Sequence, residues 1–243
     1  TPASLTKQKF DLKYQIDAIK QSLSILEKHN GVIIADVVGL GKSIVASTIA
    51  ANLGKKTVII CPPHLTKQWD DYRFEFGYNA KVYSCGLIEE ALKENHSEET
   101  KLIIIDEAHR YRNPLTIDYA NLHKLCQGNK VILLSATPYN NTPEDLFSLI
   151  KLFQIPSKST LQTVDNLSFE FSSLITSYKE LKKKQKENKI EQDELKAKID
   201  LISEEMRSIL YPLVIRRSRI DLDLIKEYRT DLKKQGIEFP IVN

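Results

Sequence analysis

The first 30 residues carry apolar positions at helical spacing, and the pattern then changes. These positions are Leu12, Ile16, Ile19, Leu23 and Leu26. Because residues three and four apart share one face of a helix, the spacing predicts a helix over residues 1–30. The stretch His29-Asn30-Gly31 is a typical stop signal for such a helix.

Short apolar runs then alternate with segments of helical potential. The runs are Val32–Ala35, Thr57–Cys61, Leu102–Ile105 and Val131–Leu134. The helical segments are Ser43–Leu53, Leu65–Phe76, Ile88–Lys93, Ile117–Cys126 and Pro143–Phe153. Continuous rather than alternating apolar runs indicate strands that are buried on both faces. The sequence therefore predicts an α/β fold, with a parallel sheet covered by helices on both faces.

The composition shifts after about Lys158. Residues 174–210 are dense in Lys, Glu and Gln, with apolar positions at helical spacing, which predicts two charged helices broken near Glu187–Asn188. The tail predicts a helix over Leu222–Lys234 and the start of a strand at 239–243. We divide the chain into an α/β domain at 1–158, a helical protrusion at 159–212 and a return segment at 213–243.

A glycine-rich loop follows the first apolar run directly. Its residues are Val38, Gly39, Leu40, Gly41, Lys42 and Ser43. Such a loop between a strand and a helix turns backbone N–H groups toward phosphates, and the helix N-terminus adds favourable dipole charge. Lys42 would reach the β- and γ-phosphates, and the Ser43 hydroxyl would hold Mg²⁺. Asp36 stands where the general phosphate-loop pattern has glycine, so an ordinary strand-to-helix turn is the alternative.

Two carboxylates follow the run Leu102–Ile105, in the order Asp106-Glu107-Ala108-His109. Since parallel strands end at the same edge of a sheet, these carboxylates are expected beside the glycine-rich loop. Asp106 would hold Mg²⁺, and Glu107 would orient and deprotonate an attacking water. Acidic residues also cap helices, but the loop earlier in the chain favours the catalytic interpretation.

The last apolar run leads into Ser135-Ala136-Thr137-Pro138. The hydroxyls of Ser135 and Thr137 could hydrogen-bond to His109 and sense the γ-phosphate. A simple turn before proline explains the same residues equally well.

Composition and charge narrow the class of protein only slightly. Hydrophobic residues make up 42% and charged residues 28% of 243, which is typical of a globular domain. No apolar run has the length of a membrane span, and no signal peptide opens the chain, so we expect a protein inside the cell with no membrane partner. The three cysteines form no Cys-x-x-Cys pair, and a net charge of +3 permits nucleic-acid binding without demonstrating it.

In this order, the motifs resemble those of superfamily 2 helicases, and more narrowly the Swi/Snf-type DNA translocases, nearest to their bacterial RapA/HepA-like group. The resemblance covers roughly residues 5–243 and implies a RecA-like P-loop lobe. Leu12–Gln15 resembles the adenine-reading Q motif, and Ala35–Ser43 resembles motif I, where the family carries an aspartate at the position of Asp36. The implied nucleotide contacts are Tyr14, Gln15, Asp36, Val38, Gly39, Leu40, Gly41, Lys42, Ser43 and Ile44.

Three further motifs and two later segments complete the resemblance. Cys61–Trp69 resembles motif Ia, Asp106–Asn113 motif II and Ser135–Asn141 motif III. The charged helices resemble the family's protrusion, a possible surface for protein partners. Ile215–Arg219 resembles the segment that returns to the core, and its arginines are expected at the nucleotide site or a second lobe, with DNA as the alternative. The implied nucleic-acid contacts are Lys67, Gln68, Arg110, Arg112, Asn113 and Asn140, although any of them could instead be a solvated surface residue.

The resemblance implies an ATP- and Mg²⁺-dependent motor that acts on duplex DNA. Motifs IV to VI would lie on a second RecA-like lobe, which begins where this chain ends, so we expect a fragment that binds ATP but hydrolyses it poorly. The expected location is the bacterial cytoplasm, at the nucleoid. Two alternatives stay open: a DEAH-type RNA helicase, and a scaffold that binds nucleotide without hydrolysing it.

Overall fold

The computed structural model describes residues 1–6, 10–37, 39–95, 99–135 and 142–237. Its strands are β1 (Gly31–Ile34), β2 (Thr57–Cys61), β3 (Ala80–Ser84), β4 (Leu102–Ile105), β5 (Lys130–Leu134) and β6 (Val214–Ile215). Its α-helices are α1 (Pro2–Leu5), α2 (Lys13–His29), α3 (Lys42–Leu53), α4 (Thr66–Glu75), α5 (Ile88–Glu94), α6 (Ile117–Cys126), α7 (Pro143–Ile150), α8 (Leu167–Lys186), α9 (Gln192–Leu210), α10 (Arg219–Leu224) and α11 (Lys226–Lys234). Short 3₁₀ turns include η1 (Pro63–Leu65), η2 (Cys85–Leu87), η3 (Ala108–Tyr111), η5 (Pro156–Lys158) and η6 (Tyr211–Leu213).

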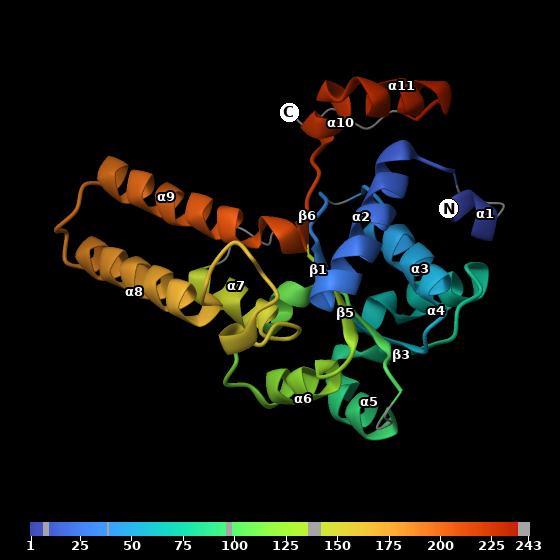
Figure 1. The fold of residues 1–243 in the computed structure, drawn as a ribbon, viewed down its shortest axis with the longest axis horizontal. Coiled ribbons are helices and arrows are strands. Elements are labelled where there is room, and N and C mark those ends of the chain that lie inside the picture. The colour runs from blue at the N-terminus through green and yellow to red at the C-terminus, as the bar shows by residue number, and fades with distance from the viewer. Residues whose placement is uncertain (7–9, 38, 96–98, 136–141, 238–243) are drawn as a thin grey trace.

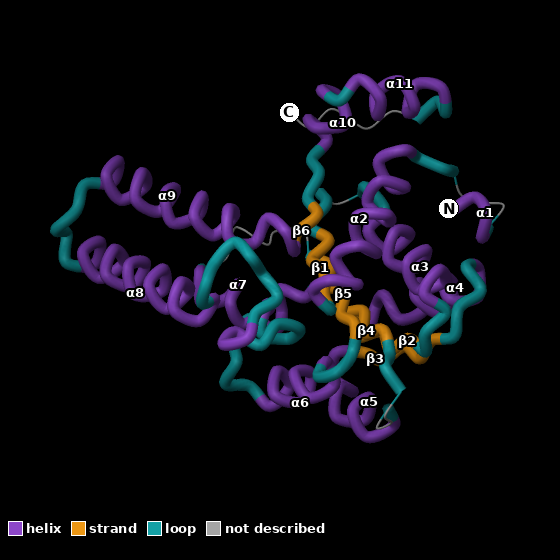
Figure 2. Tube along the Cα trace, in the orientation of Figure 1, coloured by secondary structure: helices purple, strands orange, loops and turns teal. Residues whose placement is uncertain are grey.

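The six described strands form one sheet in the order β3-β2-β4-β5-β1-β6, and every pairing is parallel. Figure 1 shows the sheet nearly edge-on, with α2, α3 and α4 on one side and α5 and α6 on the other. The same arrangement is visible in the strand colours of Figure 2. The predicted α/β fold with helices on both faces is therefore confirmed.

Successive residues of the central strands face opposite sides of the sheet. Ile33, Ile103 and Leu133 belong to the core shared with α5, α6 and α7, whereas their neighbours Ile34 and Ile104 belong to the core shared with α2, α3 and α4. All five side chains are no more than 1% exposed. Burial on both faces explains why the strands read as continuous apolar runs.

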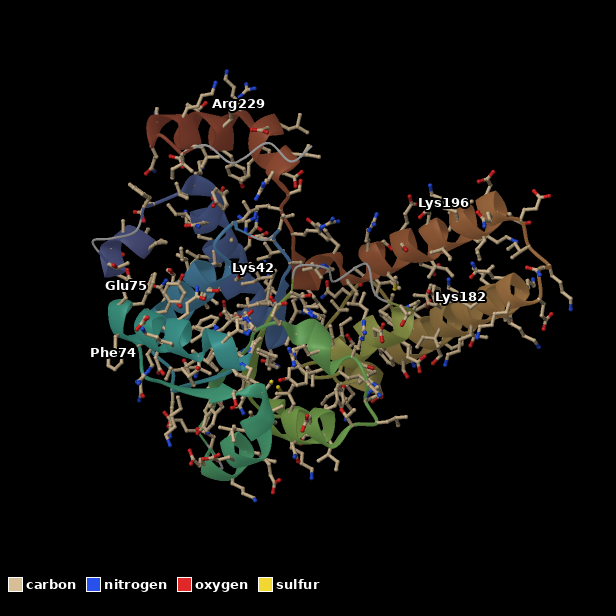
Figure 3. All side chains as sticks on the ribbon, turned by 180° about the vertical axis from the view of Figure 1, so that it is seen from behind. Lys42, Phe74, Glu75, Lys182, Lys196 and Arg229 are labelled. Atoms are coloured by element: carbon tan, nitrogen blue, oxygen red, sulfur yellow. The ribbon has the colours of Figure 1, made fainter. Side chains whose placement is uncertain are left out.

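Helices α8 and α9 form a hairpin that extends away from the sheet (Figure 1). Lys182 on α8 and Lys196 on α9 lie along this extension in Figure 3. At its base, Phe171 stacks on Phe147 of α7 with ring centroids 4.8 Å apart, and the apolar stripe of the hairpin continues the core on that face of the sheet. The hairpin thus occupies the segment for which the sequence predicts a protrusion, and α8 begins at Leu167 rather than near residue 174.

Two strands were not predicted. In β3, buried Ala80 and Tyr83 flank an exposed Lys81 and a half-buried residue, because this strand lies at the edge of the sheet formed by the described strands. Its sequence therefore lacks a continuous apolar run. Strand β6 has only two residues, too few to give a pattern, and pairs with Ile33 and Ile34 of β1.

The predicted helix over residues 1–30 is wrong at its start, and the predicted tail helix is divided. Thr1 caps the short helix α1, which ends at Thr6 in an extended conformation, and α2 begins only at Lys13. In the tail, Ser218 and Asp221 form a capping box that begins α10, and the extended backbone of Ile225 separates α10 from α11. The predicted strand at 239–243 lies outside the described residues.

No helix among the described residues has the length and apolar character needed to cross a bilayer.

Candidate nucleotide site

The glycine-rich loop connects β1 to α3. Gly39 and Gly41 have positive φ values of 90° and 82°, a conformation that residues with a side chain rarely adopt. A Cβ atom on Gly41 would lie 2.5 Å from Nε2 of Gln15, so a side chain here would displace the Gln15 amide in addition to straining the backbone. Lys42 begins α3 and donates from Nζ to the carbonyl oxygen of Asp36 at 2.8 Å. The Lys42 side chain thus folds back over the glycine-rich loop, at the position where loops of this kind bind phosphates.

The start of α2 lies directly against this loop. Tyr14 Oη and Gln15 Nε2 each donate to the carbonyl oxygen of Leu40 at 3.2 Å. Tyr14 and Leu40 also share a small apolar cluster with Leu222 of α10 and Leu232 of α11. Tyr14 and Gln15 are predicted to contact the nucleotide. The structure places both residues against the glycine-rich loop, which is predicted to bind the same nucleotide.

Asp36 is fully buried, and its carboxylate contacts the return segment. Arg217 Nη2 lies 3.1 Å from Oδ2, while the Arg217 backbone N–H and Nε donate to Oδ1 at 2.8 and 3.3 Å. Arg217 Nη1 also donates to the carbonyl oxygen of Tyr14. Burial raises the pKa of Asp36, and the positive charge of Arg217 opposes that rise. The Asp36 side chain, predicted among the nucleotide contacts, thus joins the glycine-rich loop to β6.

Asp106 directly follows β4 and is 7% exposed. Its Oδ2 accepts a hydrogen bond from the indole N–H of Trp69 at 2.9 Å, and Oδ1 accepts one from the backbone N–H of Glu107 at 2.9 Å. Burial raises the pKa of the Asp106 carboxyl, and both hydrogen bonds oppose the rise because they favour the charged form.

Lys42, Asp106 and Glu107 lie close enough to influence one another electrostatically. Burial lowers the pKa of Lys42, and the carboxylates of Asp36, Glu107 and Asp106 oppose that change. Figure 3 places Lys42 within the body of the molecule. The donor set fits Mg²⁺·ATP: glycines that allow a close approach of phosphate, a cation at the loop, a carboxylate at Asp106 and a hydroxyl at Ser43. Mg²⁺ in nucleotide sites needs only one or two protein carboxylates beside the phosphates, so the fit does not depend on a larger ligand cluster, and the described residues contain no group of three or more His, Cys, Asp or Glu that could hold a metal.

Glu107 has a left-handed backbone with φ of 53°, one of three such residues other than glycine in the described chain. This uncommon conformation begins η3 and places Glu107 Oε2 3.1 Å from Nδ1 of His109, an ion-pair distance without hydrogen-bond alignment. Strained backbone of this kind persists where surrounding structure enforces it, and it is frequent at functional sites. Both side chains are about two-fifths exposed and thus accessible to ligand and water.

The predicted nucleic-acid contacts fall on two surface segments. Lys67 and Gln68 are exposed on α4, and Arg110, Arg112 and Asn113 are exposed in and after η3. The Asn113 side chain accepts a hydrogen bond from the Leu115 backbone at 3.0 Å. Ser135 is buried at the end of β5. Val38, Thr137 and Asn140 lie outside the described residues.

The sequence did not reveal the role of Trp69, nor the specific partner of Arg217. Trp69 is 1% exposed in the core of α2, α3 and α4, and only the fold brings its indole to Asp106. Arg217 was expected at the nucleotide site or a second lobe, and the structure places it on Asp36, 181 residues earlier. The aspartate in the glycine-rich loop was the one signal in the sequence for this pairing, because an aspartate that becomes buried needs a cationic or hydrogen-bonding partner.

A parallel sheet with a glycine-rich loop after β1 and an Asp-Glu pair after β4 defines a RecA-like P-loop lobe. Residues 77–235 match the SNF2-related domain family, which is more than half of the chain. The chain therefore belongs to the SNF2-related family.

Curated relatives and solved structures agree with this assignment. The chain is 31% identical over 166 residues to the uncharacterized ATP-dependent helicase YqhH of Bacillus subtilis, covering 59% of the chain and 29% of that protein. It is 26% identical over 247 residues to the ATP-dependent DNA helicase DDM1 of Arabidopsis thaliana, covering 87% and 31%. The chain thus spans less than a third of the length of either relative.

Two solved structures share the fold. One is the Sulfolobus solfataricus SWI2/SNF2 ATPase core in complex with dsDNA, with a TM-score of 0.67 and 21% identity, covering 90% of the chain and 47% of that protein. The other is the same organism's SWI2/SNF2 ATPase core domain, with a TM-score of 0.64 and 23% identity, covering 90% and 46%.

Proposed function

We propose that this chain is the ATP-binding lobe of a nucleic-acid-stimulated ATPase that moves along or remodels protein-bound duplex DNA. The observation that carries the proposal is the gathering of Lys42, Asp106 and Glu107 at the edge of the sheet that holds the glycine-rich loop. Membership of the SNF2-related family supports the same reaction class.

Each residue then has a chemical task. Lys42 exchanges its contact with the Asp36 carbonyl for the β- and γ-phosphates, and the backbone N–H groups of the loop hold the remaining oxygens. Asp106 and Ser43 would hold Mg²⁺, which would neutralise charge on the phosphates. Glu107 orients the attacking water and accepts its proton.

We further propose that a second lobe completes the site with an arginine. Such an arginine is worth about 10³–10⁵ in rate in other phosphoryl-transfer systems. The 243-residue chain alone should therefore bind Mg²⁺·ATP and turn it over far more slowly than about 1 s⁻¹, the low end for intact enzymes. Turnover at or above that rate would contradict the need for a second lobe.

Duplex DNA is the proposed partner. The SWI2/SNF2 core of similar fold was solved in complex with dsDNA. Here Lys67 and Gln68 are exposed on α4, which reaches Asp106 through Trp69, and Arg110 and Arg112 are exposed in and directly after η3. Cationic and amide side chains of this kind bind backbone phosphates without sequence preference. The α8–α9 hairpin is proposed as a surface for protein partners.

The test is the ATPase rate of a protein in which this chain is followed by a second helicase lobe, measured with no nucleic acid, duplex DNA, single-stranded DNA or RNA. We expect the strongest stimulation by duplex DNA, lost in Lys42→Ala and retained in the control Lys20→Ala, an exposed lysine on α2. Stimulation by RNA alone would indicate an RNA helicase. ATP binding without hydrolysis under any of these conditions would indicate a scaffold.

A further inference from the structure

Trp69 connects the helix of motif Ia to the proposed magnesium site. Its ring is the largest of the fully buried side chains and packs within the core of α2, α3 and α4. Tyr72, one turn later on α4, meets the ring edge-on with centroids 6.1 Å apart. From this fixed position the indole N–H donates to Oδ2 of Asp106 at 2.9 Å.

The donors around Asp106 leave its charge available. Its other oxygen, Oδ1, accepts from the Glu107 backbone N–H, so each oxygen is held by one neutral donor. An indole N–H can only donate, and a hydrogen bond to a carboxylate is stronger than one between neutral groups. Trp69 therefore fixes the rotation of the carboxylate without neutralising it, and lone pairs on both oxygens remain for a cation or its water.

We propose that Trp69 is the positioning residue that orients Asp106 for Mg²⁺, so that α4 and the bound Mg²⁺·nucleotide share one rigid connection. The proposal rests on the nucleotide-binding function proposed above. Groups that orient metal ligands from behind commonly change metal affinity by about 10–100-fold when they are removed. Lys67 and Gln68, the preceding residues, are exposed on the same helix, so the element that holds Asp106 also faces solvent where nucleic acid would bind.

Trp69 is the single tryptophan among the 243 residues, so its fluorescence reports this contact directly. The first measurement is the intrinsic emission of the chain on addition of ATP, once with EDTA and once with Mg²⁺. A ribose-labelled fluorescent ATP analogue measures binding separately. We expect the tryptophan emission to change with Mg²⁺·ATP, and to change much less when ATP binds in EDTA.

The second measurement uses Trp69→Phe, which keeps an aromatic ring and removes the donor. We expect the Mg²⁺ concentration for half-maximal analogue binding to rise about 10-fold or more. Analogue binding in EDTA should stay unchanged, because the loop and Lys42 are untouched. The control Tyr72→Phe, which removes a hydroxyl one turn away on α4, should leave the Mg²⁺ dependence as it is.

A merely structural role for Trp69 predicts a different result. Trp69→Phe would then lower the Tm and weaken analogue binding equally with and without Mg²⁺, which would overturn the inference. An unchanged emission of the wild-type chain, with Mg²⁺·ATP shown to be bound, would overturn it even if the variant failed to fold. No binding of the analogue under either condition would instead overturn the proposed function, and this inference with it.

Discussion

Two buried aspartates lie at the edge of the sheet that carries the glycine-rich loop, and their partners differ in charge. Asp36 follows β1 and contacts the guanidinium of Arg217, whereas Asp106 follows β4 and, among the residues that the structure describes, accepts hydrogen bonds from the neutral N–H groups of Trp69 and Glu107. Burial raises the pKa of both carboxyls. A cation beside Asp36 cancels its charge, so that residue joins two segments of the fold. Asp106 keeps its charge, so it can still attract a cation.

The comparison shows that position after a strand does not decide what a carboxylate does. Both residues follow buried parallel strands, and both were predicted as site residues. The two aspartates differ in the element that packs against them. Strand β6 brings Arg217 to Asp36, and α4 brings Trp69 to Asp106. A buried ion pair destabilises the fold when one partner is removed, whereas a carboxylate that is hydrogen-bonded to neutral groups can still attract a cation.

The largest expected effect comes from removing the cation of the first pair. Arg217→Ala leaves the Asp36 carboxylate buried without a partner, and breaking a buried pair in this way costs about 3–5 kcal/mol. Urea unfolding of the chain should show this loss, whereas Ala at the neighbouring exposed Arg216 should cost much less. If the pair is the cause, Asp36→Asn should restore part of the stability in the Arg217→Ala background. A loss below about 1 kcal/mol in Arg217→Ala would contradict the assignment.

A smaller effect on stability, with a large effect on binding, is expected at the second aspartate. Both oxygens of Asp106 accept hydrogen bonds, so the amide of Asp106→Asn must turn its NH₂ group toward Trp69 or toward the Glu107 N–H. One donor is then left unpaired, which costs about 1–3 kcal/mol. Mg²⁺-dependent binding of ATP should fall by at least the roughly 10–100-fold that is typical when a group behind a metal ligand is removed, because here the ligand itself changes.

The double variant Trp69→Phe/Asp106→Asn checks this explanation, because the indole donor is then absent and the amide can face the ring. Its free energy of unfolding should exceed the value expected from adding the two single changes. Strict additivity would show that the hydrogen bond between Trp69 and Asp106 does not couple them.

The sequence predicted much of this edge because its signals are local. Continuous apolar runs gave β1, β2, β4 and β5, and the residues directly after them placed the glycine-rich loop and the Asp106-Glu107 pair at one edge. These residues then lie together because the carboxyl ends of parallel strands meet at the same edge of the sheet.

What the sequence did not show depends on pairings between distant segments. The bond between Arg217 and Asp36 joins residues 181 positions apart, and it follows from the two-residue strand β6, which has no periodicity to detect. The position of Trp69 follows from the packing of α4, whose apolar stripe predicts burial but not the polar atom that the indole N–H would meet. Edge strand β3 was missed because its exposed side interrupts the apolar pattern.

The smallest effect expected is the part of the pH dependence of stability that Asp106 contributes. Its pKa in the folded chain lies above the ordinary value of 3.8, so between these two values the native state binds more protons than the unfolded state. The contribution of Asp106 to the free energy of unfolding must therefore fall as pH rises through that window. Asn at this position does not titrate, so the difference between wild type and Asp106→Asn should change by about 1.4 kcal/mol for each unit of raised pKa, and level off above the folded-state pKa. Urea unfolding of both proteins from about pH 4 to pH 7 measures it, and a difference that stays constant across this range would show that the Asp106 pKa is not raised. Trp69→Phe sharpens the result: without the indole donor that favours the carboxylate, the window should extend to higher pH.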